Sequence, residues 1–197
     1  MNRKLSIATA IALGLFSCAS RQEATTLQAS PLAPSAASVG QTYRVTRVAD
    51  GDTITVSDAR NRDVKIRFSC VDSPEVSHTK RELSSNDPAD LNQFRWGERA
   101  RERLLQLIHQ GGDRVGLTVV DEDRYGRRVA EVRLPNGTLV QEVLAREGLA
   151  VFYRKYARNC RSAASVERAE AFAKQQQAGI WSDSQFVQPS VWRHRNK

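Results

Sequence analysis

The sequence predicts an α+β fold that is mainly β, in which five short strands form a small barrel accompanied by about three helices. Three segments alternate apolar and polar residues, as half-buried strands do. Two later segments also look like strands, and apolar residues at helical spacing occur between and after them. The chain has 197 residues, of which 40% are hydrophobic, so it can form one ordinary core.

The first three strands are expected at 43–48, 53–57 and 64–70. The third is the clearest, because apolar residues occupy every second position throughout it. Arg67 lies between two of these positions and therefore points to the opposite face of the strand. The sequence thus predicts that Arg67 is free to meet a substrate.

A polar segment and a helix follow the third strand. Residues 76–92 contain turn-forming residues and no periodicity, which indicates a surface loop. From Ala100 onward, apolar residues recur at i, i+4, i+7 and i+8, and Gly111 and Gly112 end the predicted helix.

The remaining elements complete the predicted barrel. Two strands are expected at 115–119 and 129–134, followed by a short helix at 140–146 that stops at Gly148. The last helix is expected at about 165–177. Five short strands with such helices fit a small mixed barrel, and the OB-fold is the closest architecture of that kind.

The two ends of the chain are expected to lie outside the folded domain, which spans 41–185. Residues 1–17 combine a positive start with a short apolar run, as a signal peptide does. The run ends in a pattern that resembles a bacterial lipoprotein cleavage box with Cys18 as the lipidated residue; ordinary signal-peptidase cleavage nearby is the alternative. Residues 18–40 have the composition of a flexible linker, and residues 186–197 that of a basic tail.

These features predict an exported protein that is either secreted or anchored to the bacterial cell envelope, with the membrane as a partner through lipid on Cys18. The net charge of +8 and the isoelectric point near 9.9 favour a polyanionic partner. A basic, solvated surface explains the charge alone equally well, so the motifs have to decide.

Carboxylates and arginines cluster in a few short segments. Asp50–Thr53 and Val71–Glu75 each carry two carboxylates in a turn after an apolar strand. Carboxylates held close together raise one another's pKa, and a divalent cation such as Ca²⁺, which prefers oxygen ligands, removes that cost. Arg67 and the segment Asp123–Arg127 add guanidinium groups, which bind phosphate in bidentate fashion. Together these groups describe phosphodiester hydrolysis.

The order of these motifs resembles the staphylococcal nuclease (thermonuclease) family. The strings are Asp-Gly-Asp-Thr, Arg-x-x-x-x-Asp-Ser-Pro-Glu and Asp-Arg-Tyr-Gly-Arg, and the likeness continues through Glu147–Ala150 and Gly179–Trp181. It covers nearly everything from Tyr43 to Trp181, with compatible spacing. The resemblance implies an OB-fold barrel.

The resemblance also implies a Ca²⁺ site. Asp52 and Asp72 match the family's metal-binding aspartates, and the backbone carbonyl of Ser73 matches a third ligand. Asp50 would act through a water molecule. Without the other motifs, Asp52 and Asp72 would be interpreted as turn-forming or helix-capping residues.

The remaining site residues are assigned from the same likeness. Glu75 is the candidate general base, although a solvated loop glutamate is the alternative. Arg67 and Arg127 would hold the scissile phosphate, where surface salt bridges are the alternative. Arg124 and Tyr125 match positions that contact a terminal phosphate.

Two tyrosines follow Gly148, where the family places aromatic residues near the base. Tyr153 and Tyr156 are therefore expected to bind substrate by stacking, with core packing an equal alternative for Tyr153. The sequence does not decide which of the two stacks.

The expected function is that of a monomeric, Ca²⁺-dependent phosphodiesterase that hydrolyses DNA and RNA as an endonuclease or exonuclease. Cleavage that leaves 3′-phosphate ends is implied by the resemblance alone. The alternative is a non-catalytic OB-fold module of the envelope that binds nucleic acid or protein. Relatives of that kind lack the acidic residues and arginines, whereas this chain has all of them.

Cysteine parity predicts one disulfide. If Cys18 carries lipid, Cys70 and Cys160 remain, and an exported domain lies in an oxidising compartment. The alternative is two unconnected thiols, with Cys70 buried in the barrel as a small hydrophobic residue.

Overall fold

The computed structural model describes residues 41–196. The predicted signal peptide, the lipidated Cys18 and the linker therefore lie outside the described residues. Within the described range, no helix is long and apolar enough to cross a membrane.

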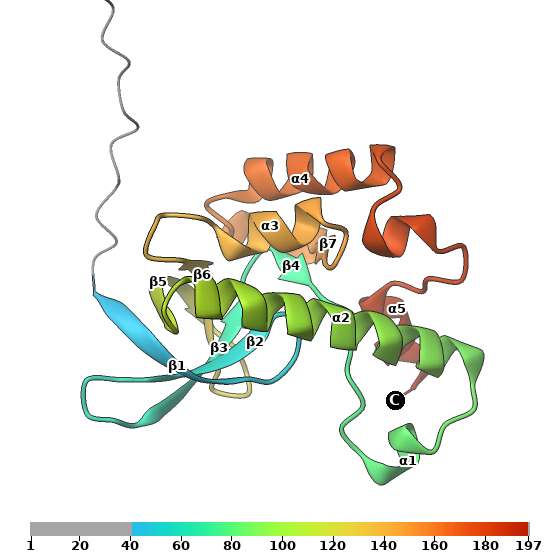
Figure 1. Cartoon of the computed structure of the whole chain (residues 1–197), viewed down its shortest axis with the longest axis horizontal. Helices are drawn as coiled ribbons and strands as arrows, with labels where there is room; N and C mark the ends of the chain where they lie inside the picture. Colours follow the sequence, from blue (N-terminus) through green and yellow to red (C-terminus); the bar gives the residue numbers. More distant parts are fainter. Residues whose placement is uncertain (1–40, 197) are drawn as a thin grey trace, which may run out of the picture. The chain divides into compact units, whose positions relative to one another are not determined.

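Five strands form a closed barrel, as the alternating sequence pattern predicts (Figure 1). They are β1 (Thr42–Val48), β2 (Thr53–Ser57), β3 (Asp63–Phe68), β5 (Arg114–Glu122) and β6 (Arg128–Arg133). The order around the barrel is β1-β2-β3-β6-β5, and β5 returns to pair with β1. Only the β3–β6 pair is parallel; the other four are antiparallel.

The register of β3 brings distant parts of the chain together. Arg67 lies opposite Thr53 on β2 and opposite Val129 on β6. The turn that contains Asp52 precedes β2, and the turn that contains Arg127 precedes β6. Barrel closure therefore places both turns at the same end as Arg67.

Helix α2 (Pro88–Gln110) covers the barrel and is longer than the sequence pattern indicates. Its N-cap is Asp87, whose side chain accepts a hydrogen bond from the backbone N–H of Ala89, and Pro88 occupies its first turn. A short helix, α1 (Lys80–Leu83), precedes α2, and a capping box between Thr79 and Glu82 caps its N-terminus. The expected loop at 76–92 is thus partly helical, because caps rather than apolar periodicity begin both helices.

The second half of the domain packs around α3 (Val140–Arg146) and α4 (Ala163–Gln175). A two-stranded sheet joins β4 (Val71–Asp72) to β7 (Val151–Phe152). This pairing starts directly after the barrel strand β3, because Cys70 has a positive φ of 73° that redirects the chain. Two 3₁₀ helices follow, η1 (Arg154–Asn159) and η2 (Gly179–Ser182).

The segment expected to be a basic tail at 186–197 instead contains helix α5 (Pro189–Arg195). Proline in the first turn favours the start of a helix, and the Trp192 side chain is buried. Its ring packs edge-on against Phe94 of α2, with the ring centroids 5.7 Å apart. The folded domain therefore extends beyond 185, because one large apolar residue anchors the short helix.

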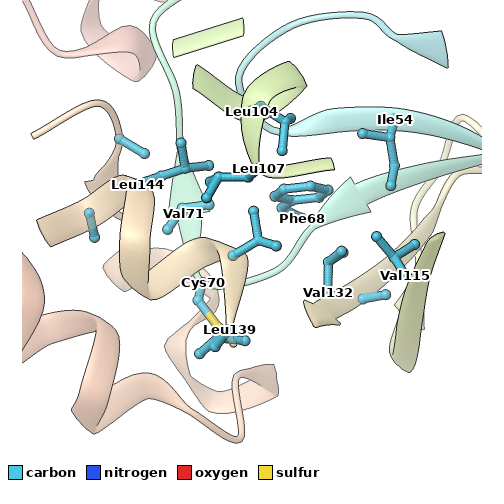
Figure 2. Packing of buried hydrophobic residues seen from close by; sticks show 14 of the residues in the cluster. Ile54, Phe68, Cys70, Val71, Leu104, Leu107, Val115, Val132, Leu139 and Leu144 are labelled. Atoms are coloured by element: carbon cyan, nitrogen blue, oxygen red, sulfur yellow. The ribbon is translucent and has the colours of Figure 1, made fainter. Parts of the chain in front are cut away.

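The core fills the space between the barrel, α2 and α3 (Figure 2). Ile54, Phe68, Val115 and Val132 contribute from the barrel strands. The α2 side of the core contains the residues expected from the helical spacing, Ala100, Leu104, Leu107 and Ile108. Val71, the neighbour of Asp72 in β4, belongs to the same cluster, so the core packs against the segment that carries this site residue.

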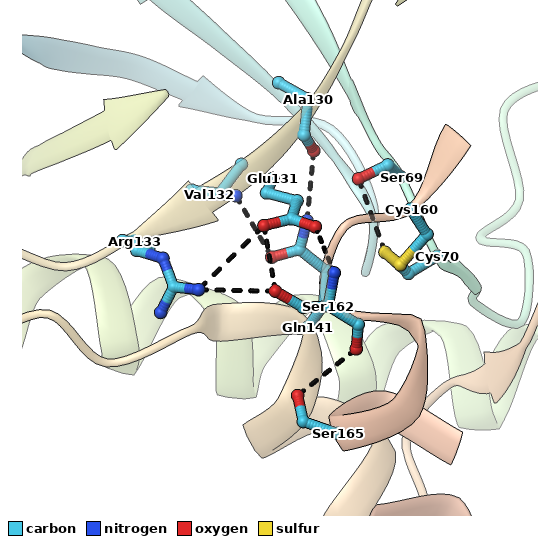
Figure 3. The surroundings of a disulfide bond; sticks show 10 residues. All are labelled: Ser69, Cys70, Ala130, Glu131, Val132, Arg133, Gln141, Cys160, Ser162 and Ser165. Carbon is cyan, nitrogen blue, oxygen red and sulfur yellow. Dashed lines mark hydrogen bonds and ion pairs between the residues drawn. A yellow bond between two sulfur atoms is a disulfide. The ribbon is translucent and has the colours of Figure 1, made fainter. Parts of the chain in front are cut away.

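Cys70 and Cys160 form a disulfide, with Cα atoms 5.3 Å apart and a separation of 90 positions in the sequence (Figure 3). Glu131 lies next to the sulfurs, and its carboxylate accepts hydrogen bonds from the backbone N–H and hydroxyl of Ser162, at 2.6 and 2.9 Å. The sulfurs bond to each other, so this group is structural. The bridge fixes the η1 region beside the start of β4.

Candidate active site

Two buried aspartates form the base of the candidate site. Asp52 lies in the β1–β2 turn and Asp72 in β4, and they are 1% and 0% exposed. Gly51 allows the two turns to meet, because a Cβ atom there would lie 2.0 Å from the Ser73 hydroxyl oxygen and 2.6 Å from the Ala100 Cβ. The Asp-Gly-Asp string therefore has a steric reason as well as a chemical one.

Asp52 is held on both carboxylate oxygens. The Ser73 backbone N–H donates to Oδ2 at 2.7 Å, and Arg67 donates to Oδ1. Asp50 accepts a hydrogen bond from the Asp52 backbone N–H at 2.9 Å. Burial raises the pKa of Asp52 well above its usual range; Arg67 acts in the opposite direction, while Asp50 and Asp72 raise the pKa further.

Arg67 bridges the two aspartates. Its Nη1 bonds to Asp52, and its Nη2 donates to Oδ1 of Asp72 at 2.7 Å. Burial by itself would lower the pKa of Arg67, but the charges of Asp52 and Asp72 more than offset this effect, so the pKa is raised. The sequence places Arg67 correctly opposite the apolar face, but its guanidinium is paired with carboxylates rather than free.

Glu75 follows the Ser73–Pro74 turn and remains 21% exposed at its side chain. Its backbone is fixed by α2: a Cβ on Gly97 would lie 2.0 Å from the Glu75 carbonyl oxygen. The buried Gln93 amide, oriented to satisfy both its ends, accepts from the Glu75 N–H at 3.2 Å and donates to the Val187 carbonyl at 3.1 Å. These contacts fix the backbone of Glu75, and with it the position of its Cα atom.

Arg193 is a site residue that sequence reasoning missed. It lies on α5, and its guanidinium donates to Glu75 Oε1 at 2.5 Å and to Asp72 Oδ2 at 2.7 Å. Two features of the sequence indicate this helix: Pro189, which favours the start of a helix, and Trp192 three residues later, a large apolar residue that can be buried. Because the segment is short and basic, these features are a weak signal.

The turn of the β5–β6 hairpin carries two arginines and a tyrosine of the candidate site. Asp123 organises the turn by accepting hydrogen bonds from the backbone N–H groups of Tyr125 and Arg127, at 2.9 and 3.0 Å. Arg127 also forms an ion pair with Asp123, with Nε 2.8 Å from Oδ2. Arg124 donates to the Tyr125 hydroxyl at 2.6 Å, and Tyr125 as a residue is 68% exposed. The hairpin therefore presents cations and an aromatic ring to solvent.

These groups line one cavity of about 1090 Å³. Its walls include the predicted residues Asp50, Arg67, Glu75, Arg124, Tyr125, Arg127, Tyr153 and Tyr156. The two last tyrosines pack edge-on, with ring centroids 5.1 Å apart. Asp52, Asp72 and Ser73 do not line the cavity but are buried next to it, where Arg67 joins both aspartates to the wall.

The donor set fits a hard divalent cation. Asp52 and Asp72 carry carboxylate oxygens, and Ser73, the next residue after Asp72, carries a backbone carbonyl. A third carboxylate, Asp50, accepts from the Asp52 N–H. Arg67 occupies one oxygen of Asp52 and one of Asp72, so a cation would take over part of the charge pairing that this guanidinium now provides. Burial, and after it the charges of Asp50 and Asp72, raises the pKa of Asp52, and a bound cation acts in the opposite direction by favouring the ionised carboxylate. The set contains only oxygen ligands, which Ca²⁺ prefers.

Comparison with known proteins agrees with this geometry. Residues 65–183 match the family model described as "Staphylococcal nuclease homologue". The chain belongs to the staphylococcal nuclease family. The match includes most of β3 with Arg67, the segment from Asp72 to Glu75, and the β5–β6 hairpin with Arg127, whereas the turn that contains Asp50 and Asp52 precedes the matched range.

Several relatives in the family are similar over most of the chain. An "Uncharacterized endonuclease" of Escherichia coli O157:H7 is 36% identical over 152 residues, which are 77% of this chain and 84% of that protein. A "Micrococcal nuclease" of Shigella flexneri is 30% identical over 161 residues, or 78% and 80% of the two chains. "Endonuclease YhcR" of Bacillus subtilis is 36% identical over 143 residues, but these are 71% of this chain and only 11% of that protein.

Proposed function

We propose that this staphylococcal nuclease family member is a Ca²⁺-dependent nuclease that hydrolyses phosphodiester bonds in DNA and RNA. The observation that supports it most is the convergence of Glu75, Arg67 and Arg127 on one cavity, with the buried pair Asp52 and Asp72 joined to it. The names of the relatives, endonuclease and micrococcal nuclease, agree with this activity.

In the proposed reaction, Glu75 removes a proton from a water molecule, and the resulting hydroxide attacks phosphorus. Arg67 and Arg127 stabilise the negative charge that builds on the phosphate oxygens. Ca²⁺ held by Asp52, Asp72 and the Ser73 carbonyl would supply further positive charge at the phosphate. The bond from phosphorus to the 5′ oxygen breaks, and this oxygen takes up a proton from solvent water. The products are a 5′-hydroxyl and a 3′-phosphate, as the family resemblance implies.

Substrate would be held by the exposed groups of the cavity. We propose that Arg124 and Tyr125 contact a phosphate and that Tyr153 and Tyr156 stack on a base, which is supported by the position of all four in the cavity wall. Stacking on aromatic rings is tolerant of sequence and contributes about 1–3 kcal/mol per base. Such contacts do not discriminate strongly between DNA and RNA, so we propose activity on both.

The test is hydrolysis of single- and double-stranded DNA and RNA by the mature protein in Ca²⁺, in Mg²⁺ and in EDTA. We expect activity in Ca²⁺, much less in Mg²⁺, whose octahedral geometry is stricter, and none in EDTA. Full hydrolysis in EDTA would contradict the metal assignment. Nucleic-acid binding without cleavage in every metal would instead favour the non-catalytic OB-fold module.

Glu75→Gln tests the general base. The amide can hold a water molecule but cannot take its proton, so turnover should fall by about 10²–10⁴-fold while nucleic-acid binding stays nearly unchanged. Glu102→Gln is the matched control, because Glu102 is exposed on α2 and does not line the cavity. Near-normal turnover of Glu75→Gln would show that the base lies elsewhere.

We also propose that the protein is exported, and either secreted or lipid-anchored through Cys18. The signal-like sequence of residues 1–17 supports this, as does the Cys70–Cys160 disulfide, which suits an oxidising compartment. Cys18→Ala should move the protein from membranes into the soluble fraction. A variant that still fractionates with membranes would count against the anchor.

A further inference from the structure

Helix α5 is fixed to the body of the domain at two places. The Trp192 ring packs against Phe94, and its Nε1 donates to Asp90 of α2 at 2.7 Å. Before α5, the side chain of Asp183 accepts hydrogen bonds from Asn92 and Trp96 of α2, both at 2.8 Å. Figure 1 shows α5 beside the N-terminal half of α2. The helix is therefore a docked element rather than a tail.

Because α5 is docked in this way, the guanidinium of Arg193 contacts two carboxylates of the site. Arg193 uses Nη1 for Glu75 and Nη2 for Asp72, one donor for each acid. Its side chain is 33% exposed, whereas Asp72 is fully buried. A planar guanidinium holds its donors at fixed angles, so it sets the distance and orientation between the two carboxylates.

The charged groups of the site alternate in sign along one connected chain. Asp52 pairs with Arg67, Arg67 with Asp72, Asp72 with Arg193, and Arg193 with Glu75. Asp72 uses a different oxygen for each arginine, Oδ1 for Arg67 and Oδ2 for Arg193. Three carboxylates are thereby fixed relative to one another by two arginines, one from the barrel and one from α5.

We propose that Arg193 is a positioning residue of the active site, which fixes the Glu75 carboxylate relative to Asp72. The inference rests on the proposed function, because it is Glu75 as general base that Arg193 positions. Without Arg193, the Glu75 side chain loses the one ion pair that the described structure gives it. It then samples rotamers that do not hold the attacking water in line.

Arg193 also affects the cation site. It carries the same sign of charge as Ca²⁺ and occupies Oδ2 of Asp72, which is one of the proposed ligand residues. The cation must therefore share Asp72 with Arg193 or displace it. Removing Arg193 should for this reason tighten Ca²⁺ binding while it slows turnover. These opposite effects distinguish positioning from a general loss of structure, which would weaken both.

The experiment compares Arg193→Gln and Arg193→Lys with the wild-type protein. Ca²⁺ affinity is measured by calorimetry in the absence of nucleic acid, and kcat and KM are measured on single-stranded DNA at saturating Ca²⁺. Arg193→Gln should lower kcat about tenfold or more with little change in KM. It should lower the Ca²⁺ Kd by about tenfold, the effect of removing one nearby positive charge.

Arg193→Lys separates charge from geometry. Lysine keeps the positive charge, so the Ca²⁺ Kd should stay close to wild type. A single ammonium does not reproduce the paired donors of the guanidinium, so kcat should remain lowered. If Arg193→Gln fails to fold, as judged by tryptophan fluorescence and circular dichroism, the kcat of Arg193→Lys decides. Full activity of the lysine variant overturns the proposal.

Arg195→Gln is the matched control. Arg195 lies on the same helix, is exposed and forms no ion pair within residues 41–196, so its loss should change neither kcat nor the Ca²⁺ Kd. A folded Arg193→Gln protein with wild-type kcat, or with Ca²⁺ binding weakened in parallel with kcat, overturns the inference alone. A wild-type protein that neither binds Ca²⁺ nor hydrolyses nucleic acid overturns the proposed function, and the inference with it.

Discussion

Asp183 provides the most direct test of how the C-terminal segment is held. Its carboxylate accepts hydrogen bonds from Asn92, Arg95 and Trp96 on α2, at 2.8, 2.7 and 2.8 Å. The backbone N–H of Gln185 donates to it at 2.9 Å. The Trp96 hydrogen bond, followed by the other donors, lowers the pKa of Asp183 to about 2 from an ordinary value of 3.8.

The shift converts to stability through proton linkage. A difference of nearly two pKa units between the folded and unfolded states corresponds to roughly 2 kcal/mol in the free energy of unfolding. Because the folded pKa is the lower one, this stabilisation is fully present above about pH 4. It is lost as the pH falls from 3.8 toward 2, where the folded state also takes up the proton.

Asp183→Asn should therefore lower the free energy of unfolding by about 1–3 kcal/mol at pH 7. The difference from wild type should shrink as the pH approaches 2, where the wild-type carboxylate is protonated as well. Urea denaturation of both proteins at pH 7, 4 and 2.5 measures this. Asp87→Asn is the control, because Asp87 is the exposed N-cap of α2 and asparagine caps a helix about as well as aspartate, so the free energy of unfolding at pH 7 should change little. A difference below about 0.5 kcal/mol at pH 7 would refute the reasoning.

Two further perturbations test the contacts around the site. Gly97→Ala places a Cβ 2.0 Å from the Glu75 carbonyl oxygen, and this overlap with backbone should lower the free energy of unfolding by about 1–3 kcal/mol. At a helix position without such an overlap, replacing glycine by alanine stabilises the protein instead. Denaturation and kcat should both show a loss, and an alanine variant as stable and active as wild type would contradict the close packing. Replacing Cys160 by alanine should lower the free energy of unfolding by about 2–5 kcal/mol, measured by urea denaturation without reductant. If reductant lowers the stability of the wild type to that of the variant, the disulfide accounts for the difference between the two proteins. If reductant has no effect on the wild type, the disulfide is absent in solution.

Much of the barrel follows from local pattern. The alternation in β1, β2 and β3 predicts the strands because one face of each meets the core and the other meets solvent. The parallel β3–β6 pair is different: it joins segments separated by a long helix and another strand, and nothing in either segment specifies the partner. Only the family resemblance supplied that level of organisation.

The site divides in a similar way. Asp52, Arg67, Asp72 and Glu75 lie in compact motifs whose residue types indicate their chemistry, and the fold brings them together. Arg193 gives no such indication, because it is one basic residue among several near the C-terminal end. Its position depends on the burial of Trp192, which is a tertiary contact. The α1 and α2 starts were missed for a related reason, since caps are short signals within a polar segment.

The order in which the site residues occur along the chain has a consequence for synthesis. Asp52 and Asp72 belong to the first half of the described chain, whereas Cys160 and Arg193 belong to its last quarter. A nascent chain that has left the ribosome as far as β6 contains the buried carboxylates and Arg67. It still lacks the partner of Cys70 and the guanidinium that holds Glu75. Under the proposed function, a partly made polypeptide therefore carries the acids of the site without the contacts that fix them, so the site is complete only once the last quarter of the chain has been made.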